Sequence, residues 1–540
     1  MTTTRQSVEM AKEFKGNDSA LLGIVLAVIT FWLFAQTTLN IGPAMGQDIN
    51  TPATVMNIAI SLSALFSGMF IVVAGGFADR IGRVRMTTIG NILGIIGSLL
   101  VGLAITGGVG NVMLIIGRIL QGLSAACIMP ATMALLKTYW QGAARQRAVS
   151  MWSIGSWGGS GLAAIFGGFM ASKALGWRSI FIICALISVV SILLMRQIPE
   201  DAPAKDAGAK TDVPGIFTLA TFVLTLLLVV TQGSTIGWTN WITWTLLAVS
   251  IIALTLFIRV ENKSEAPLVD FSLFKNPVFT GATISNLMIN ATAGLIPVTL
   301  WVLQDAAGMD AATAGYYTLG YAIFIIAFIR VGEKLLQRFG AKKPMMWGAM
   351  IVIAAIILLM GTNVMTQTYL VLAIIAFSLF GLGLAFYATP STDAALSALP
   401  DDKAGAGSGV YKMASSLGAA FGAAIPTTIY TVLSTSDSTL LGSAIEFTGR
   451  QDNTAVREAA MLGLGATLVM ALIALSSIIL FVPGDAGSKT SDSAPTKADE
   501  LLATAKEDLA AAEEKAAKAQ EEARLARQRY EEAQEALAKE

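Results

Sequence analysis

Long apolar segments recur along this chain, and they constrain its fold more than any other feature. Stretches of 18 or more mainly apolar residues follow one another over most of the 540 positions. Hydrophobic residues make up 54% of the chain and charged residues only 13%, against about 25% charged in soluble domains. About 20 apolar residues suffice to cross a bilayer as a helix. The sequence therefore predicts an all-α polytopic membrane protein.

Fourteen of these segments can be counted, and the loops between them are mostly short. Within a bilayer each backbone polar group needs an internal partner, so we expect every segment to be helical. The segments are 20–43, 54–75, 87–107, 111–135, 148–171, 179–195, 214–233, 241–258, 278–303, 314–332, 345–361, 368–390, 407–433 and 460–482.

Basic residues predict the orientation, because Lys and Arg favour cytoplasmic loops. With the N-terminus inside, the inner segments before the tail carry 21 Lys and Arg residues. The outer loops carry four, namely Lys173, Arg178, Arg450 and Arg457. Residues 1–18 are polar, so no cleavable signal peptide is expected. We predict a multi-pass protein of the inner (cytoplasmic) membrane with both termini cytoplasmic.

A weak repeat divides the chain into related halves. "DRIGR" at 79–83 recurs as "QRFGA" at 337–341, which aligns Arg80 with Arg338 and Gly82 with Gly340. Two six-helix halves with two inserted helices would explain fourteen. The expected parts are a cytoplasmic N-terminus (1–19), a six-helix bundle (20–196), a linker with two extra helices (197–277), a second six-helix bundle (278–482) and a charged cytoplasmic helical tail (483–540).

The tail differs in composition from the rest of the chain. It is rich in Ala, Glu, Lys and Arg, with many opposite charges four residues apart, which predicts a long solvated helix. Its few large apolar residues would make only a weak coiled-coil seam. A solvated helix, self-association and a partner site all remain open.

The chain lacks the residues that several kinds of catalysis and cofactor binding require. The chain has no histidine, so histidine-dependent nucleophilic catalysis is excluded and any proton coupling must use carboxylates. Cys127 and Cys184 lie inside apolar segments, and no cysteine cluster indicates a metal. No phosphate-binding G-x-x-x-x-G-K-[ST] motif is present. The basic loops fit membrane topology better than nucleic-acid binding. We expect neither an enzyme nor a bound cofactor.

The strongest local motif is "GGFADRIGRVR" at 75–85, between the second and third segments. An Asp at a helix end can accept hydrogen bonds from a facing helix N-terminus, and arginines can hold its orientation. Such a contact can form in one conformation and break in another. The residues of this latch motif are Gly75, Asp79, Arg80, Gly82, Arg83 and Arg85.

The latch motif resembles loop motif A of the major facilitator superfamily, and fourteen segments resemble its drug:proton antiporter branch. "GRILQGLSAA" (117–126) is similar to motif B of the fourth helix, and "SIGSWGGSGLAAIFGGF" is similar to motif C of the fifth. "TPSTDAAL", "ITFWLFAQTTLN" and the 405–422 region resemble the Nor-type quinolone and multidrug exporters of Gram-positive bacteria. The resemblance runs from about 20 to 482 and implies transport driven by the proton gradient.

Arg118 lies seven residues into the fourth segment. An unpaired Arg at the bilayer centre costs about 2.5–3.5 kcal/mol, so we expect it to face the bundle interior. The resemblance implies a role for it in coupling, together with Gln121. Drug:proton antiporters of this branch often have an acid in helix one, but the matching stretch "AQTTLN" has Ala35 there. This departure weakens the transfer of their cation-recognition scheme.

Few carboxylates can carry a proton. Asp393 follows the twelfth segment and Lys412 begins the thirteenth, so the two could form an ion pair near the cytoplasmic end. A purely structural pair is the alternative. Asp48 and Asp305 lie at outer helix ends and are the other proton-coupling candidates.

Polar and aromatic residues within apolar segments are candidates to line a substrate cavity. For the aromatic ones, packing or interfacial anchoring is the alternative. The candidates are Gln36, Asn40, Asn57, Gln121, Asn286, Asn290, Trp152 and Tyr321.

The fifth segment contains a ladder of small residues at four-residue spacing: Gly155, Gly159, Ala163 and Gly167. Such ladders let a partner helix approach closely. We expect a packing or sliding surface between the halves. Where the antiporter motif has Gly-Pro, this chain has Ala163-Ala164, which predicts a regular, less kinked helix.

The sequence thus predicts a proton-coupled exporter of drugs or other amphipathic compounds, in contact with membrane lipids. One alternative is a dedicated exporter of a physiological solute or lipid precursor, which the missing helix-one acid favours. Another is a membrane sensor or scaffold whose output is the tail.

Overall fold

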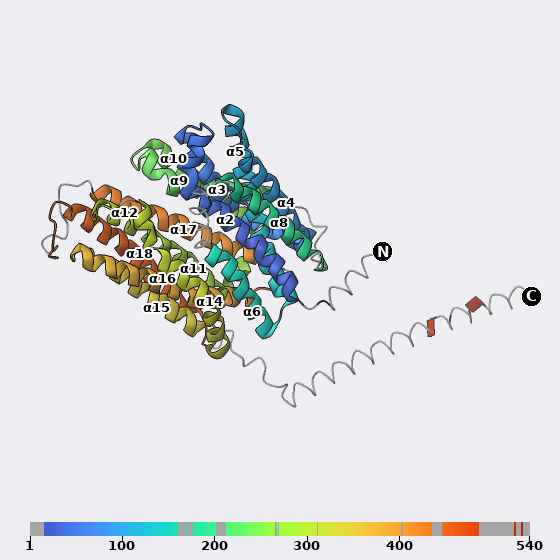
Figure 1. Cartoon of the computed structure of the whole chain (residues 1–540). Helices are drawn as coiled ribbons and strands as arrows, with labels where there is room; N and C mark the ends of the chain where they lie inside the picture. Colours follow the sequence, from blue (N-terminus) through green and yellow to red (C-terminus); the bar gives the residue numbers. More distant parts are fainter. Residues whose placement is uncertain are drawn as a thin grey trace, which may run out of the picture. The chain divides into compact units, whose positions relative to one another are not determined.

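The computed structural model describes residues 14, 16–159, 170, 176–200, 212–264, 267, 269, 271–309, 311–400, 403–434 and 445–484, with five positions near the C-terminus. The regular structure of these residues is helical (Figure 1). At some helix positions, including 36, 40 and 57, only the backbone is described. The chain divides into two compact units, Met1–Ser488 and Lys489–Glu540.

The first half of the membrane unit packs around α5. This helix contacts both α3 and α4, while α8 packs against α2 and α4. The helices of this half are α2 (Asp18–Asp48), α3 (Ala53–Ile81), α4 (Arg83–Gly102), α5 (Gly108–Tyr139), α6 (Gly142–Ser153) and α8 (Arg178–Met195).

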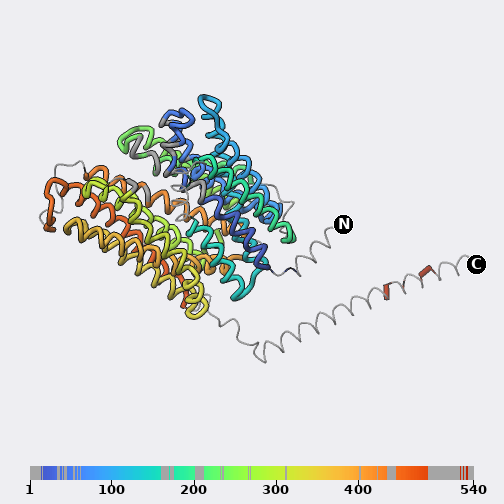
Figure 2. Tube along the Cα trace, in the orientation of Figure 1, coloured from blue at the N-terminus to red at the C-terminus, as the bar shows by residue number. Residues whose placement is uncertain are grey.

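The second half packs in a similar way around α16, which contacts both α14 and α15. A 3-10 turn (Thr292–Gly294) joins α11 to α12, and α17 and α18 pack on each other and on α11. The helices of this half are α11 (Pro277–Ala291), α12 (Leu295–Asp305), α13 (Ala311–Tyr316), α14 (Leu319–Phe339), α15 (Lys342–Leu359), α16 (Thr366–Ser397), α17 (Ala404–Ser434) and α18 (Thr454–Phe481). Figure 2 traces the path of the chain through both halves.

One glycine pair in each half fixes a close helix contact. A Cβ on Gly97 of α4 would lie 2.8 Å from the carbonyl oxygen of Gly117 in α5, and a Cβ on Gly117 would lie 2.8 Å from that of Gly97. Gly348 of α15 and Gly383 of α16 form the same reciprocal contact, at 2.6 and 2.8 Å. Two helices can approach this closely only where both lack a side chain. The halves thus share a packing device, as two related bundles would.

Two further helices follow the first half: α9 (Val213–Ile236) and α10 (Trp241–Glu261). They pack on each other, and α9 also contacts α3 of the first half and α17 of the second. Large apolar side chains of α10 such as Ile251 and Ile252 are exposed. That exposure suits a helix surrounded by lipid.

Short polar side chains begin several of these helices. Asn17 accepts a hydrogen bond from Ala20 N (2.8 Å) before α2, and Asp212 accepts one from Gly215 N (2.8 Å) before α9. Asn276 does the same for Val278 N (2.9 Å) at α11. Each cap satisfies a backbone N–H that the helix leaves free, which explains why helices begin at these residues.

Eleven helical spans of the described residues are long and apolar enough to cross a membrane, where the sequence predicts fourteen segments. The remaining segments coincide with α2, α6 and α14. The last turns of α14 contain Arg330, Glu333, Lys334 and Arg338, which lower its apolar character. Segment 148–171 runs beyond the described residues after 159. The polytopic helical class is confirmed, and the count of fourteen stays a prediction.

The predicted helical tail lies almost wholly outside the described residues. The five that are described are helical and exposed: Ala523, Arg524, Arg527, Glu531 and Glu532. The predicted cytoplasmic helix and its self-association therefore stay predictions.

Candidate functional site

The latch motif joins the two halves at one end of the bundle. Near the C-terminal end of α3, Asp79 accepts hydrogen bonds from the backbone N–H groups of Gly405 and Ala406, both at 2.9 Å, at the start of α17. A helix N-terminus presents free N–H groups and a partial positive charge, so a carboxylate is a favourable partner for it. The predicted Asp-to-helix contact is present, and its partner is α17.

Arg83 holds the Asp79 carboxylate in place. Its Nε and a terminal nitrogen lie 3.1 and 2.8 Å from Asp79 Oδ1, and its other terminal nitrogen donates to Thr138 Oγ1 of α5 at 2.6 Å. Both charged side chains are 8% exposed. A charge-assisted bond in such a place is stronger than a neutral one. Three helices of one half therefore orient a carboxylate toward the other half.

Two glycines allow α3 and α17 to meet here. A Cβ on Gly75 would lie 2.4 Å from the carbonyl oxygen of Gly405, and a Cβ on Gly405 would lie 2.5 Å from that of Gly75. Gly82 ends α3 with φ of 109°, a conformation that favours glycine. Arg80 lies half-buried in the last turn of α3.

A residue that was not predicted completes this turn. Glu200 accepts hydrogen bonds from Val84 N (2.9 Å) and Arg85 N (2.8 Å), which are the first free N–H groups of α4. Its carboxylate also lies 3.8 Å from the Arg85 guanidinium. Glu200 follows the sixth segment, so only the folded chain brings it to the third.

A second carboxylate contact joins the halves. Asp393 of α16 is fully buried and accepts a hydrogen bond from Arg145 Nε of α6 at 3.0 Å. Arg145 also donates to Ser397 Oγ at 2.7 Å, and Lys137 of α5 donates to the carbonyl of Leu399. The second oxygen of Asp393 has no hydrogen-bond partner. The Asp393–Lys412 pair that the sequence suggested is wrong: the partner of Asp393 is Arg145, 248 positions away.

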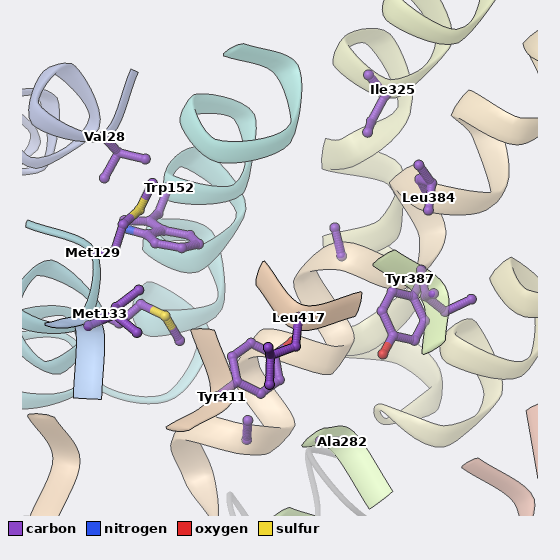
Figure 3. Packing of buried hydrophobic residues seen from close by; sticks show 14 of the residues in the cluster. Val28, Met129, Met133, Trp152, Ala282, Ile325, Leu384, Tyr387, Tyr411 and Leu417 are labelled. Carbon is purple, nitrogen blue, oxygen red and sulfur yellow. The ribbon is translucent and has the colours of Figure 1, made fainter. Parts of the chain in front are cut away.

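Lys412 lies instead over an aromatic ring of the other half. Its Nζ is 4.3 Å from the ring centre of Trp152 in α6. The indole is fully buried among apolar side chains that include Met129 and Met133 (Figure 3), and its Nε1 donates to Thr132 Oγ1 at 3.1 Å. Trp152 is therefore a fixed aromatic surface at the junction of the halves.

Arg118 is fully buried in α5 and is bound by neutral oxygens. The carboxylates of the first half that the sequence offered, Asp48 and Asp79, are engaged elsewhere. The acceptors of Arg118 among the described side chains and backbone groups include Ala59 O (3.0 Å), Ile60 O (3.3 Å), Ser63 Oγ (2.6 Å), Thr38 Oγ1 (3.3 Å) and Gln121 Oε1 (2.9 Å). The guanidinium thus ties α2, α3 and α5 together inside one half.

Asp48 and Asp305 both have partners at helix ends. Asp48, beyond the apolar part of α2, accepts hydrogen bonds from Arg178 and from Trp177 Nε1 (3.2 Å). The hydrogen bond from Arg178 holds the pKa of this carboxyl below its usual value, so it stays ionised at neutral pH. Asp305, at the end of α12, accepts a hydrogen bond from Tyr430 of α17 at 2.6 Å.

Several cavity candidates are bound within their own half. Gln121 donates to Ser98 Oγ at 3.2 Å. Asn286 donates to Tyr411 O (2.9 Å) and Ser415 Oγ (2.6 Å), which ties α11 to α17. Asn290 donates to Asn286 Oδ1 (2.9 Å), and Tyr321 packs on Phe380 with ring centres 5.4 Å apart. The side chains of Gln36, Asn40 and Asn57 lie outside the described residues.

The small-residue ladder does not form a surface between the halves where it is described. A Cβ on Gly155 would lie 3.2 Å from Val25 O, and one on Gly159 would lie 3.0 Å from Trp32 Cβ, so both glycines face α2 of the same half. The residue that faces the other half is Gly158, against Ile326 of α14. Ala163 and Gly167 lie outside the described residues.

The less kinked helix expected at Ala163-Ala164 lies outside the described residues and stays a prediction. Residues Ile154–Gly158 form a π-helical turn directly after α6. A π turn widens a helix locally and is a common cause of bending. This turn precedes the position at which the antiporter motif has its proline.

Among the buried acids that were missed, two show how the choice of segment ends matters. Glu458 lies in the first turns of α18, two positions before the predicted segment, and one of its carboxylate oxygens has no hydrogen-bond partner. Glu333 lies in α14 one residue beyond its segment and pairs with Arg330. Both could have been found by extending apolar segments through single charges.

Taken together, two helical bundles joined by breakable polar contacts define a membrane transporter. The Major Facilitator Superfamily model matches residues 20–423, and the chain belongs to that superfamily. It is therefore a transporter of the cell membrane and not an enzyme.

Similar proteins agree with this family. The chain is 44% identical over 470 residues to the quinolone resistance protein NorB of Staphylococcus aureus strain MRSA252, covering 87% of this chain and 97% of that protein. Over 432 residues it is 44% identical to NorB of strain JH9, covering 80% and 92%.

Among solved structures, the proton:xylose symporter XylE bound to 6-bromo-6-deoxy-D-glucose matches with a TM-score of 0.57 at 15% identity, covering 90% of this chain and 98% of that one. The human organic anion transporter MFSD10 (TETRAN) matches with a TM-score of 0.57 at 12% identity, covering 84% and 98%. At these identities the likeness concerns the fold alone.

Proposed function

We propose that this protein is a proton-coupled exporter of drugs or other amphipathic small molecules that works by alternating access. One observation carries the proposal: two buried carboxylates, Asp79 and Asp393, tie the two halves together at one end through bonds that can be broken without unfolding either half. Transporters of this superfamily generally need no cofactor, and the proton gradient would supply the energy.

The topology would consist of fourteen helices with both termini in the cytoplasm, α2, α6 and α14 being the three beyond the eleven apolar spans. In that topology the latch motif and the Asp393 contact lie on the cytoplasmic side. The structure would then represent a state that is closed toward the cytoplasm. In the change to the other state, the charged residues of the latch motif would separate from α17, and the helices of each half would move with that half.

A proton on Asp393 would weaken its bond to Arg145, because a neutral carboxyl lacks the charge that makes this bond strong. Loss of this tie would favour separation of α6 and α16 and opening toward the cytoplasm. Asp305 and Asp48 are the other candidate carriers. Asp48 is the weaker of these, because Arg178 keeps it ionised. Arg118, bound within one half, would position α2, α3 and α5 and not carry the proton.

The relatives' name supports the substrate class. NorB is named as a quinolone resistance protein, and a chain 44% identical to it over 87% of its own length is expected to export related amphipathic compounds. Substrates, protons and lipids would be its partners, and nucleic acid would not.

Two other functions have specific support. Ala35, at the position of the usual helix-one acid, favours a dedicated exporter of a physiological solute or lipid precursor without stoichiometric antiport. The charged tail favours a sensor or scaffold, and deletion of 485–540 would separate this from transport. Unchanged efflux after the deletion would make the tail accessory.

The decisive experiment is substrate uptake into inverted membrane vesicles with an imposed pH gradient. Wild type should accumulate a quinolone only while the gradient lasts, and Asp393→Asn should lose this dependence. Arg145→Gln should also weaken it, because the bond that protonation of Asp393 would break is then already lost. Asp452→Asn, in an exposed outer-loop pair with Arg450, is the matched control. Uptake that survives collapse of the gradient would rule out antiport, and full coupling in Asp393→Asn would place the carrier elsewhere.

A further inference from the structure

The ammonium group of Lys412 lacks an anionic partner. This side chain is 7% exposed, and among the described residues none accepts a hydrogen bond from its Nζ. Its contacts are the rings of Trp152 at 4.3 Å and Tyr411 at 5.9 Å. A cation–π contact offsets only part of the cost of removing an ammonium from water. A bound anion would supply what the protein leaves out.

A second polar group on the same helix is also unsatisfied. Ser408 lies four residues before Lys412, on the same face of α17. It is fully buried, and its Oγ has no hydrogen-bond partner. Buried polar atoms in proteins are nearly always satisfied, by protein, water or ligand. A hydroxyl and an ammonium one helical turn apart suit the two oxygens of a carboxylate.

The position of this pair suits a substrate site. Lys412 lies seven residues beyond Gly405, about 10 Å along α17 from the contact that joins the halves. Its ring partner, Trp152, belongs to the other half and is held by Thr132. Figure 3 shows Trp152 and Tyr411 at this junction. A ligand here would touch both halves, as alternating access requires.

The charges around this junction also favour an anion. The two carboxylates that join the halves each form an ion pair with an arginine, Asp393 with Arg145 and Asp79 with Arg83. A cationic substrate would meet the Lys412 ammonium, whose contacts among the described residues are aromatic rings and include no carboxylate.

We propose that Lys412, Ser408 and Trp152 form a subsite for the carboxylate of planar aromatic substrates. The carboxylate binds the Lys412 ammonium and the Ser408 hydroxyl. As the ammonium turns to the carboxylate, the face of Trp152 becomes available to the substrate's ring. The inference rests on the proposed export function and narrows its substrates to aromatic acids and zwitterions.

The test compares a quinolone carboxylic acid with its methyl ester, which keeps the ring system and lacks the charge. Dissociation constants are measured by calorimetry on the purified full-length chain in lipid nanodiscs. Wild type should bind the acid at least tenfold more tightly. Lys412→Gln should weaken acid binding about ten- to a hundredfold, the effect of losing a charge-assisted hydrogen bond, and change ester binding less than about twofold.

Three variants control for structure. Lys412→Arg should keep the preference for the acid, and Lys263→Gln, at an exposed loop position, should behave as wild type. Ser408→Ala should weaken acid binding about two- to tenfold, which keeps the test open if Lys412→Gln does not fold. Equal binding of acid and ester by wild type, or equal losses for both in Lys412→Gln or Ser408→Ala, would overturn the subsite.

Failure of the subsite and failure of the export function are distinguishable. Gradient-driven uptake of the ester with no preference for the acid would remove the subsite and leave the exporter. Preferential acid binding without gradient-driven uptake of either compound would leave the subsite and remove proton-coupled export.

Discussion

At the scale of single residues, this protein buries charge by several different means. Arg118 is bound by neutral oxygens of its own half, Asp79 by a helix N-terminus and an arginine, and one oxygen of Asp393 by an arginine of the other half. Only the last two span the halves. Charge that stays within a half stabilises that half, and charge that spans them can regulate their contact.

Arg118→Gln should destabilise the first half without touching the contact between the halves. Removing the guanidinium leaves buried neutral acceptors without a donor, which costs about 1–3 kcal/mol. The free energy of unfolding in detergent should fall by about this amount. Arg450→Gln, at an exposed loop position, should leave the melting temperature unchanged. Unaltered stability of Arg118→Gln would contradict the assignment of a structural role.

Asp79→Asn should open the end of the bundle at which α3 meets α17. A carboxylate at a helix N-terminus is worth about 1–2 kcal/mol in partly buried places, so the closed state should lose about tenfold in population. In a Ser408→Cys background, labelling by a membrane-impermeant maleimide in inverted vesicles should speed up by a similar factor. Asp452→Asn in the same background should label at the original rate.

At the scale of elements, backbone contact between helices sets what can move. The glycine pairs of α4 with α5 and of α15 with α16 leave no room for side chains, so each pair moves as one piece. The contact of Gly75 with Gly405 is equally close but joins different halves. Its strength depends on hydrogen bonds that can be exchanged for water, so in the proposed alternating access it is the contact that would separate.

Gly75→Ala should therefore disfavour the closed arrangement. Its Cβ would lie 2.4 Å from the carbonyl oxygen of Gly405, so the helices must move apart at a cost of about 1–3 kcal/mol. Gradient-driven uptake should fall several-fold, and labelling of Ser408→Cys should rise. Gly108→Ala is the matched control, since nothing lies within 4 Å of its added Cβ. Normal transport by Gly75→Ala would show that this close approach is dispensable.

The helices could be predicted far better than their polar contacts. Apolar length alone located the segments, and the latch motif located Asp79, because both signals are local in sequence. The partners of Asp79 are the backbone N–H groups of residues 405 and 406. Almost any residue type can supply such a group, so the sequence gives no signal for this contact. Arg145 was missed as the partner of Asp393 because 248 positions separate the two residues. The positive charge of Arg145 was also already accounted for by the preference of basic residues for cytoplasmic loops.

At the scale of the whole molecule, two bundles share one closed end. α3 meets α17, and α6 meets both α14 and α16, so each half contributes to two separate contacts with the other. Helix α9 lies against α3 of the first half and α17 of the second, so it contacts both halves. Movement of the halves must change these contacts together.

A linker across the closed end should therefore stop transport. Cysteines at Arg145 and Ser397, whose side chains are hydrogen-bonded across the halves at 2.7 Å, can be joined by a short flexible bis-maleimide. Uptake into vesicles should fall to background. The matched pair is Asn17 and Gln197, hydrogen-bonded at 2.9 Å within the first half, where the same linker should leave uptake intact. Transport through the 145–397 link would contradict opening at this end.

The partner that Asp79 finds in α17 also has a genetic consequence. Peptide N–H groups are supplied by every residue except proline, so almost no single-codon change at 406 can delete this donor. On the other side of the contact, one nucleotide change in the Asp79 codon removes the carboxylate. Loss-of-function alleles at this end should therefore gather in the codons for Asp79, Gly75 and Gly405, and at Ala406 only proline should behave like them.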